Sequence, residues 1–408
     1  MGESDEICNQ GDIWIRKRIC FLVDSIFSIG GVQRVTAVIA KELAKTYDVT
    51  IVTFDKPEAK DLSLYELNDT DIHFRFFTYP TVKRYKNIIC KAYSGLYMKL
   101  RPYYKWASNL YARSSFPSEL RQALLEELRQ GNYQVIIGVH APLAGRLATI
   151  KKRLPGVKTI GWIHNSFEAL FGDTFIYIGA KRKRHYVYQF RELDDVILLC
   201  HHDADSYQRY DRRFQPTVIY NPLTLAPDKR SAGCSKTFLS VGRFSRRHKG
   251  YDLLIKAFHL FAQKNTEWHL DLVGEGVEEE MYRELIQELH LEDRVTIHPF
   301  TNRIQDYYSQ AQIYVLSSRW EGFGLVLVEA MAHGLPVVSS DLPTSLEIMG
   351  DFGLYFKNGD IDSLAQQLEE ATHIDWPSKS EEAIKIAQQF NIDQIIGQWK
   401  ILIENINN

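Results

Sequence analysis

The sequence has few cysteines, and no spacing links them into a pattern. The five are odd in number and show neither a C-x-x-C nor a metal-ligand spacing: Cys8, Cys20, Cys90, Cys200 and Cys234. A disulfide scaffold and a zinc module are therefore not indicated as the basis of the fold, and we expect reduced thiols.

Long apolar stretches are lacking as well. No run approaches the roughly 18 apolar residues typical of a membrane-spanning helix. The acidic start of the chain precedes no apolar segment, so no secretory signal is predicted, and Glu6 stands where a myristoylation motif has Ser or Thr. We expect a cytoplasmic protein.

Neither sign of charge dominates the chain, whose formal net charge is −2. Residues 1–222 hold 32 basic and 24 acidic residues, whereas the rest holds 17 basic and 27 acidic residues. The two halves therefore face different partners. Because the whole chain is not basic and contains no recognisable nucleic-acid-binding module, we predict no nucleic-acid partner.

The length of 408 residues exceeds the roughly 250 to 300 at which one hydrophobic core stops growing, so two domains are expected. A proline and a polar stretch after Asn221 divide the chain into domains at 1–222 and 223–390. Both alternate helical patterns with short apolar runs, such as 135–139 and 313–316, which predicts an α/β fold with doubly wound parallel sheets. Substrate is expected in the cleft between them.

The strongest motif follows the apolar run 313–316. Gly322 and Gly324 let backbone approach a ligand closely, and the helix after them offers free N–H groups to a phosphate. Glu329 is the only acid in that otherwise apolar helix, and burying an unpaired carboxylate is costly. Ribose hydroxyls would be suitable partners. Alternatively, Glu321 caps the helix and Glu329 forms a buried hydrogen bond to a backbone group.

A second strand-turn-helix segment carries Arg243 and Lys249 just ahead of a helical pattern. Arginine can fork onto diphosphate oxygens and lysine can supply a point charge there. A solvated basic loop is the alternative, because three further basic side chains lie between the two residues.

Glycine and histidine residues mark the corresponding strand ends of the first half. Gly30 and Gly31 follow the first strand without the G-x-G-x-x-G spacing of a dinucleotide site, yet they permit close substrate approach. His164 ends the apolar run 159–163, where α/β enzymes place reactive groups, and His140 stands in the same kind of position. Each could equally be a structural histidine.

Two acidic pairs, Asp203-Ala-Asp205 and Asp360-Ile-Asp362, resemble the Asp-x-Asp metal signature. Both lie where helical patterns begin, and Asp is favoured at helix N-termini. We therefore assign both pairs to helix capping, and we predict no metal and no other cofactor.

The segment 72–118 contains nine basic residues and no acidic residue, interleaved with aromatics such as Tyr93, Tyr97 and Trp106. A basic, aromatic-rich amphipathic segment suits an anionic membrane surface, where each cation contributes about 1 kcal/mol. The basic run 181–184 adds to it. A solvated helical excursion is the alternative.

Glu321 and Glu329, with seven residues between them, and the Arg243 to Lys249 segment resemble the retaining GT-B-fold glycosyltransferases of the family-4 type (glycosyl transferases group 1, E-x7-E motif). The resemblance implies two Rossmann-like domains facing a central cleft, with a final helix in 391–408 crossing back to the first domain. It further implies transfer of a hexosyl or N-acetylhexosaminyl unit, with retention, from a nucleotide diphosphate sugar.

The resemblance also implies partners and roles for individual residues. UDP is the expected nucleotide, and a lipid-linked glycan intermediate of cell-surface polysaccharide synthesis is the expected acceptor. Catalytic roles fall to Glu321 and His164, and the cleft is lined by Gly30 and Gly31. The implied donor-binding residues are Arg243, Lys249, Phe323, Gly324, Leu325 and Glu329. A non-catalytic GT-B partner subunit and a sugar-nucleotide 2-epimerase are the alternatives.

Overall fold

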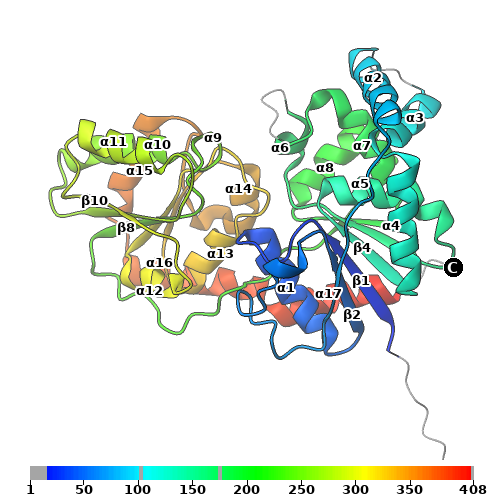
Figure 1. Cartoon of the computed structure of the whole chain (residues 1–408). Coiled ribbons are helices and arrows are strands. Elements are labelled where there is room, and N and C mark those ends of the chain that lie inside the picture. The colour runs from blue at the N-terminus through cyan, green and yellow to red at the C-terminus, as the bar shows by residue number, and fades with distance from the viewer. Residues whose placement is uncertain (1–15, 101–103, 173–176, 406–408) are drawn as a thin grey trace, which may run out of the picture.

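The computed structural model describes residues 16–100, 104–172 and 177–405, and it contains two parallel sheets flanked by helices (Figure 1). The α/β prediction is confirmed. The first sheet has the order β3-β2-β1-β4-β5-β6-β7. Its strands are β1 (Arg18–Val23), β2 (Asp48–Thr53), β3 (His73–Phe76), β4 (Val135–Val139), β5 (Lys158–Trp162), β6 (Asp195–Leu198) and β7 (Thr217–Val218).

The second sheet has the order β10-β9-β8-β11-β12-β13. Its strands are β8 (Thr237–Val241), β9 (His269–Val273), β10 (Val295–His298), β11 (Ile313–Leu316), β12 (Val337–Ser340) and β13 (Leu354–Phe356). The strand order reverses between β1 and β4 in the first sheet and between β8 and β11 in the second. Ligands of such sheets bind at these switch points, so the loops after these four strands are where a site is expected.

Helices cover both sheets. Those of the first domain are α1 (Gly31–Ala44), α2 (Arg84–Leu100), α3 (Lys105–Ser115), α4 (Ser118–Gln130), α5 (Ala141–Ile150), α6 (Phe167–Phe171), α7 (Lys183–Phe190) and α8 (His201–Tyr210). Those of the second are α9 (Arg246–Lys249), α10 (Tyr251–Ala262), α11 (Glu279–Glu288), α12 (Ile304–Gln310), α13 (Leu325–Ala332), α14 (Pro343–Met349), α15 (Ile361–Ala371) and α16 (Trp376–Ala387).

The last helix, α17 (Ile392–Glu404), lies against the first domain although it follows the second in sequence (Figure 1). The indole of Trp399 packs against Trp162 and Phe21, with ring centroids 4.8 and 6.3 Å away. Lys158 donates hydrogen bonds of 2.6 Å to two carbonyls at the end of this segment, those of Leu402 and Asn405. A cation there also complements the negative end of the helix dipole.

Helices α2 and α3 form a hairpin that projects from the first domain (Figure 1). The rings of Tyr97 and Tyr111 stack at 4.4 Å and hold the two helices together. The hairpin rests on α7, where Ser108 hydrogen-bonds to the buried ring of His185 over 2.9 Å. The basic segment 72–118 therefore holds two helices, α2 and α3, which follow β3 and the loop 77–83, and its residues 101–103 lie outside the described residues.

No helix in the described ranges is long and apolar enough to cross a bilayer. Polar side chains form part of the contact between the two domains. On the second domain, Glu347 of α14 accepts hydrogen bonds from the backbone N–H groups of His201 and His202 at 2.7 and 3.0 Å, and from the hydroxyl of Tyr220 at 2.9 Å. A carboxylate of one domain thus caps the N-terminus of α8 in the other.

Candidate active site

The segments that follow β1 and β5 of the first domain approach the segment that follows β11 of the second. A Cβ added to Gly322 would lie 1.9 Å from the carbonyl oxygen of His164, so only glycine fits this close contact. A Cβ added to Gly31 would lie 3.4 Å from Leu325. The predicted glycines and His164 therefore meet at one place, between β1 and β5 on one side and α13 on the other.

The carboxylate of Glu321 is the most constrained charge of this site. It is 7% exposed and accepts hydrogen bonds of 2.6 Å from both the Lys249 ammonium and the Ser318 hydroxyl. Burial alone would raise the pKa of Glu321, but the nearby Lys249 and His248 outweigh it and hold this pKa far below its usual range. The residue does not cap α13, whose N-cap is Gly324 without a side-chain bond.

His248 also belongs to this cluster, although no sequence motif singles it out. Its ring lies parallel to the Trp320 ring, with centroids 5.0 Å apart and an angle of 2° between the planes. Its Nε2 lies 3.8 Å from Glu321 Oε2. Two basic side chains, Lys249 and His248, thus face one carboxylate, and the stacking on Trp320 fixes the imidazole.

Glu329 is 2% exposed, and its carboxylate has three side-chain partners. Arg34 from the first domain contacts Oε1 at 3.0 Å, Thr224 donates to the same oxygen at 2.8 Å, and Tyr308 donates to Oε2 at 3.2 Å. Their presence agrees with the expectation that this acid must be paired. These partners are side chains rather than backbone groups, and the ribose contact of Glu329 stays a prediction.

The two cationic residues predicted to bind the sugar donor differ in their contacts. Arg243 is exposed and forms no ion pair within the described ranges, so its guanidinium is available to an anion. Lys249, by contrast, is already paired with Glu321. The loop between them requires glycine at its end, because Gly250 has φ 66° and a Cβ there would lie 2.2 Å from the Ser317 carbonyl oxygen.

His164 is buried, at 6% exposure, and its carbonyl oxygen faces Gly322. Its ring lies 4.2 Å from Trp162 and 5.3 Å from His140, measured between centroids. Burial, followed by the neighbouring His140, lowers the pKa of His164 well below its usual value, so this imidazole is neutral. The His140 pKa is lowered by burial too. A neutral His164 can hydrogen-bond to substrate, but it offers no positive charge.

Two predicted donor residues flank the turn before α13. Gly324 forms the helix N-cap with φ 82°, a backbone conformation that is strained for any residue with a side chain. Phe323 differs from expectation, because its ring is 3% exposed and packs between Tyr220 and Phe390 at the junction of the domains. Any donor contact of Phe323 is therefore left to its backbone.

One aspartate of each acidic pair caps a helix, with one correction. Asp360 caps its own helix by accepting from the N–H of Ser363 at 3.0 Å. Asp203 instead accepts from the N–H of Phe167 at 2.8 Å, and so caps the neighbouring α6 rather than α8. Burial raises the Asp203 pKa to about 7. Among the residues that the structure describes, no three His, Cys, Asp or Glu side chains could together hold a metal ion.

Two family models match the chain on either side of the junction between the sheets. The model "Glycosyltransferase Family 4" matches residues 29–226, and "Glycosyl transferases group 1" matches residues 225–390. The chain belongs to the glycosyltransferases. The family-4 resemblance is thereby confirmed, and the enzyme class with it.

Full-length relatives carry the same description. A Haemophilus influenzae protein named as an uncharacterized glycosyltransferase is 27% identical over 396 residues, covering 94% of this chain and 99% of the relative. The N-acetylgalactosamine-N,N'-diacetylbacillosaminyl-diphospho-undecaprenol 4-alpha-N-acetylgalactosaminyltransferase of Campylobacter jejuni is 25% identical over 354 residues, covering 84% of this chain and 87% of the relative.

A solved structure supports the GT-B fold. The Anabaena protein HepE in complex with UDP superimposes with a TM-score of 0.72 over 95% of this chain and 100% of that chain, at 21% identity. At this identity the likeness shows the shared fold: two Rossmann-like domains that face a common cleft.

Proposed function

We propose that this glycosyltransferase moves a hexosyl or N-acetylhexosaminyl unit from a UDP-sugar to a hydroxyl of a lipid-linked glycan, with retention of the anomeric configuration. The observation that carries the proposal is the buried Glu321, paired with Lys249 beside the close contact of Gly322 with His164, with its pKa held far below the usual range. A fixed negative charge there stabilises the positive charge that develops on the sugar ring as the glycosyl–phosphate bond breaks.

The negative charge that develops on the leaving diphosphate also needs partners. Arg243 is exposed at the end of β8 and can fork onto diphosphate oxygens. The free N–H groups at the start of α13 point along the positive end of the helix dipole and supply further donors. Lys249 lies beside Glu321 and can join them when the donor arrives.

The reaction needs no covalent intermediate on the protein. The bond from the anomeric carbon to the diphosphate breaks, the acceptor oxygen attacks the same face, and its proton passes to a leaving phosphate oxygen. Neutral His164 then positions sugar hydroxyls by hydrogen bonding, and Glu329 holds the ribose. The UDP bound to HepE and the undecaprenol-linked substrate in the name of the Campylobacter relative support this choice of donor and acceptor.

A panel of sugar nucleotides tests the proposal. The pure protein should hydrolyse a UDP-sugar slowly without acceptor, and the released sugar should keep the anomeric configuration of the donor when followed by NMR. Binding of none of the panel would refute the enzyme proposal and favour a non-catalytic partner subunit. Conversion of a UDP-sugar to its 2-epimer would favour the epimerase.

The α2–α3 hairpin supports a peripheral position on an anionic membrane. Apolar side chains of α2 recur at helical spacing on one face and stand in solvent, with Ile89 at 65% exposure. On α3, Trp106 is 64% exposed beside Tyr104. Together with cations of the hairpin and of the run 181–184, this exposed apolar face resembles interfacial membrane-binding surfaces. We name it the hairpin face: Tyr85, Ile88, Ile89, Leu96, Leu100, Tyr104, Trp106 and Leu110.

Vesicle binding should depend on the hairpin face. The protein should co-sediment with vesicles containing phosphatidylserine and be released by high salt, because surface attraction is screened. The double substitution Ile89→Ser and Trp106→Ser should weaken binding by about tenfold or more, since two inserted apolar side chains are lost. Leu260→Ser, an exposed apolar site on the second domain, is the matched control. Binding that ignores both anionic lipid and salt would contradict the membrane assignment.

A further inference from the structure

Three polar side chains follow three neighbouring strands of the first sheet. Asp24 comes directly after β1, and His140 comes directly after β4. The register pairs Leu22 with Gly138, two residues before each of them, so Asp24 and His140 lie side by side. His164 follows β5, the next strand of the sheet, and its ring lies 5.3 Å from that of His140. His140 therefore lies between the other two at the carboxyl edge of the sheet, where ligands of such sheets bind.

His140 adopts a backbone conformation that is almost confined to glycine. Its φ of 72° and ψ of 152° lie in a region where a residue with a side chain is strained. Its backbone is fixed on both sides, because its N–H donates to the Trp162 carbonyl at 2.9 Å and its carbonyl accepts from the N–H of Ala144 at 3.0 Å. A histidine at a position where glycine would be free of strain indicates a role for the imidazole.

The imidazole of His140 and the carboxylate of Asp24 are free to bind a ligand. Neither side chain forms a hydrogen bond or an ion pair within residues 16–100, 104–172 and 177–405. Asp55, just after β2, provides the contrast, because its carboxylate accepts hydrogen bonds from the N–H groups of Ile26 and Phe27 at 2.8 and 3.2 Å. Asp55 thus fixes the loop that begins at Asp24, whereas the exposed Asp24 has no such structural partner in the described ranges.

The chemistry of this pair suits the hydroxyl groups of a sugar. Burial lowers the pKa of His140, with the Asp24 charge opposing that shift, so the imidazole is neutral at pH 7 and offers one donor and one acceptor nitrogen. The Asp24 carboxylate accepts hydrogen bonds and repels phosphate. Because hydroxyl groups both donate and accept, an uncharged sugar matches the pair better than a diphosphate does.

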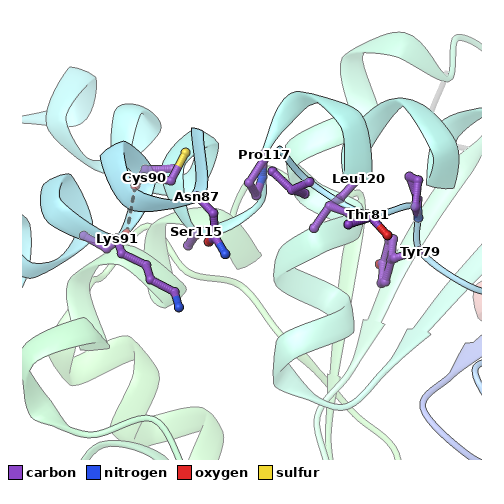
Figure 2. Close-up of a pocket in the computed structure, with 12 residues that line it drawn as sticks. Tyr79, Thr81, Asn87, Cys90, Lys91, Ser115, Pro117 and Leu120 are labelled. Carbon is purple, nitrogen blue, oxygen red and sulfur yellow. Dashed lines mark hydrogen bonds between the residues drawn. The ribbon is translucent and has the colours of Figure 1, made fainter. Parts of the chain in front are cut away.

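A pocket of about 500 Å³ at the base of the α2–α3 hairpin is a second hollow of the first domain (Figure 2). Among the side chains that line it, Lys91 is the only charged one, and none is a carboxylate or an imidazole. Two of its hydroxyl groups already bond to each other, those of Ser94 and Ser114 at 3.0 Å. The pocket therefore offers fewer free groups to a sugar than the edge of the sheet does.

We infer that Asp24 and His140 bind hydroxyl groups of the acceptor sugar and thereby position its attacking oxygen. The inference rests on the proposed function and deepens it. His164, beside His140, lies at the close contact with Gly322 of the second domain, so the pair adjoins the place where the proposed donor site meets the first domain. An acceptor sugar held there would approach the donor sugar from the first domain.

Competition between transfer and hydrolysis tests the inference. The probes are octyl glucoside, octyl galactoside and octyl N-acetylglucosaminide, offered to the full chain with the UDP-sugar that it hydrolyses, and the products are quantified by mass spectrometry. Asp24→Ala should lower the ratio of transfer to hydrolysis by about tenfold or more, because a charge-assisted hydrogen bond to the acceptor is lost. Asp69→Ala, which removes an exposed aspartate without a partner in the part of the chain that the structure describes, should keep the wild-type ratio.

Two further comparisons separate recognition from folding. His140→Gly should lower the ratio by about tenfold as well, yet melt no lower than the wild type, because glycine adopts this backbone without strain. A deoxy glycoside that lacks the recognised hydroxyl should be transferred poorly by the wild type, and Asp24→Ala should reduce its transfer little further, because the same contact is already missing.

The outcomes distinguish the inference from the proposed function. Asn87→Trp, which fills the pocket in Figure 2 from an exposed position, should keep the wild-type ratio, and a tenfold loss there would place the acceptor in that pocket instead. An unchanged ratio in both Asp24→Ala and His140→Gly would overturn the inference, as would a wild type that hydrolyses the donor but glycosylates no probe. A wild type that neither hydrolyses nor transfers would refute the proposed function itself.

Discussion

Glu321→Gln should lower turnover by roughly 10² to 10³, the loss seen when one preorganised electrostatic group is removed from an active site. The substitution keeps the shape of the side chain and removes the negative charge that faces the developing sugar cation. Affinity for UDP should change little, because the proposed diphosphate and ribose contacts are made by other side chains, and Lys249 remains a cation. Turnover is measured as release of UDP, and affinity by calorimetry.

Two comparisons sharpen this test. Glu284→Gln changes an exposed acid on α11 and should leave turnover as it is. Because Lys249 and His248 keep the pKa of Glu321 far below its usual range, the carboxylate stays ionised throughout pH 5 to 8 and adds no acid limb to the rate. Wild-type turnover in Glu321→Gln would remove this residue from the mechanism.

Arg34→Met should lower the free energy of unfolding by about 2 to 3 kcal/mol, which lowers the melting temperature by roughly 5 °C or more. The reason is that Glu329, at 2% exposure, would keep only two neutral donors for its buried charge. The expected loss lies toward the low end for a buried pair, because the Arg34 side chain is 27% exposed. Calorimetric melting measures the change.

The ion pair between Lys41 and Glu66 provides the control, since it starts on the same helix but its acid is 88% exposed. Lys41→Met should therefore change stability by less than about 1 kcal/mol. Glu329→Gln placed on Arg34→Met should restore much of the loss, because the uncompensated charge is removed. An Arg34→Met protein that melts like the Lys41→Met protein would show that Arg34 and Glu329 contribute no stability together.

The sequence predicted the fold class and most strands because buried parallel strands are continuous apolar runs. Three strands are not predicted: β3, β7 and β13. In β3 every residue is at least partly exposed, β7 has two residues and β13 has three. All three are edge strands, β3 and β7 at opposite ends of the first sheet and β13 at one end of the second. An edge strand meets solvent on one flank and often on one face, so periodicity and length carry less information.

Site residues could be predicted where a short sequence motif reveals them, but not where they depend on contacts between distant segments. Glu329 stands out in the sequence as an acid in an apolar helix. Its partner Arg34 lies 295 residues away in the sequence, so only the structure reveals their contact. The same holds for Glu347, whose backbone partners belong to the other domain. For Phe323 the family resemblance implied a donor contact, but its ring packs between Tyr220 and Phe390 at the junction of the domains.

The position of Trp399 also fixes an order of assembly during synthesis. Its indole fills the space beside Trp162 and Phe21, so the first domain to leave the ribosome lacks part of its own core while the second domain is still being translated. In the order of the sequence, the second domain is inserted between the main part of the first domain and its last helix, α17. The second domain is therefore completed before the core of the first domain can be. Nascent chains that end before α17 expose an apolar surface of the first domain, to which chaperones can bind.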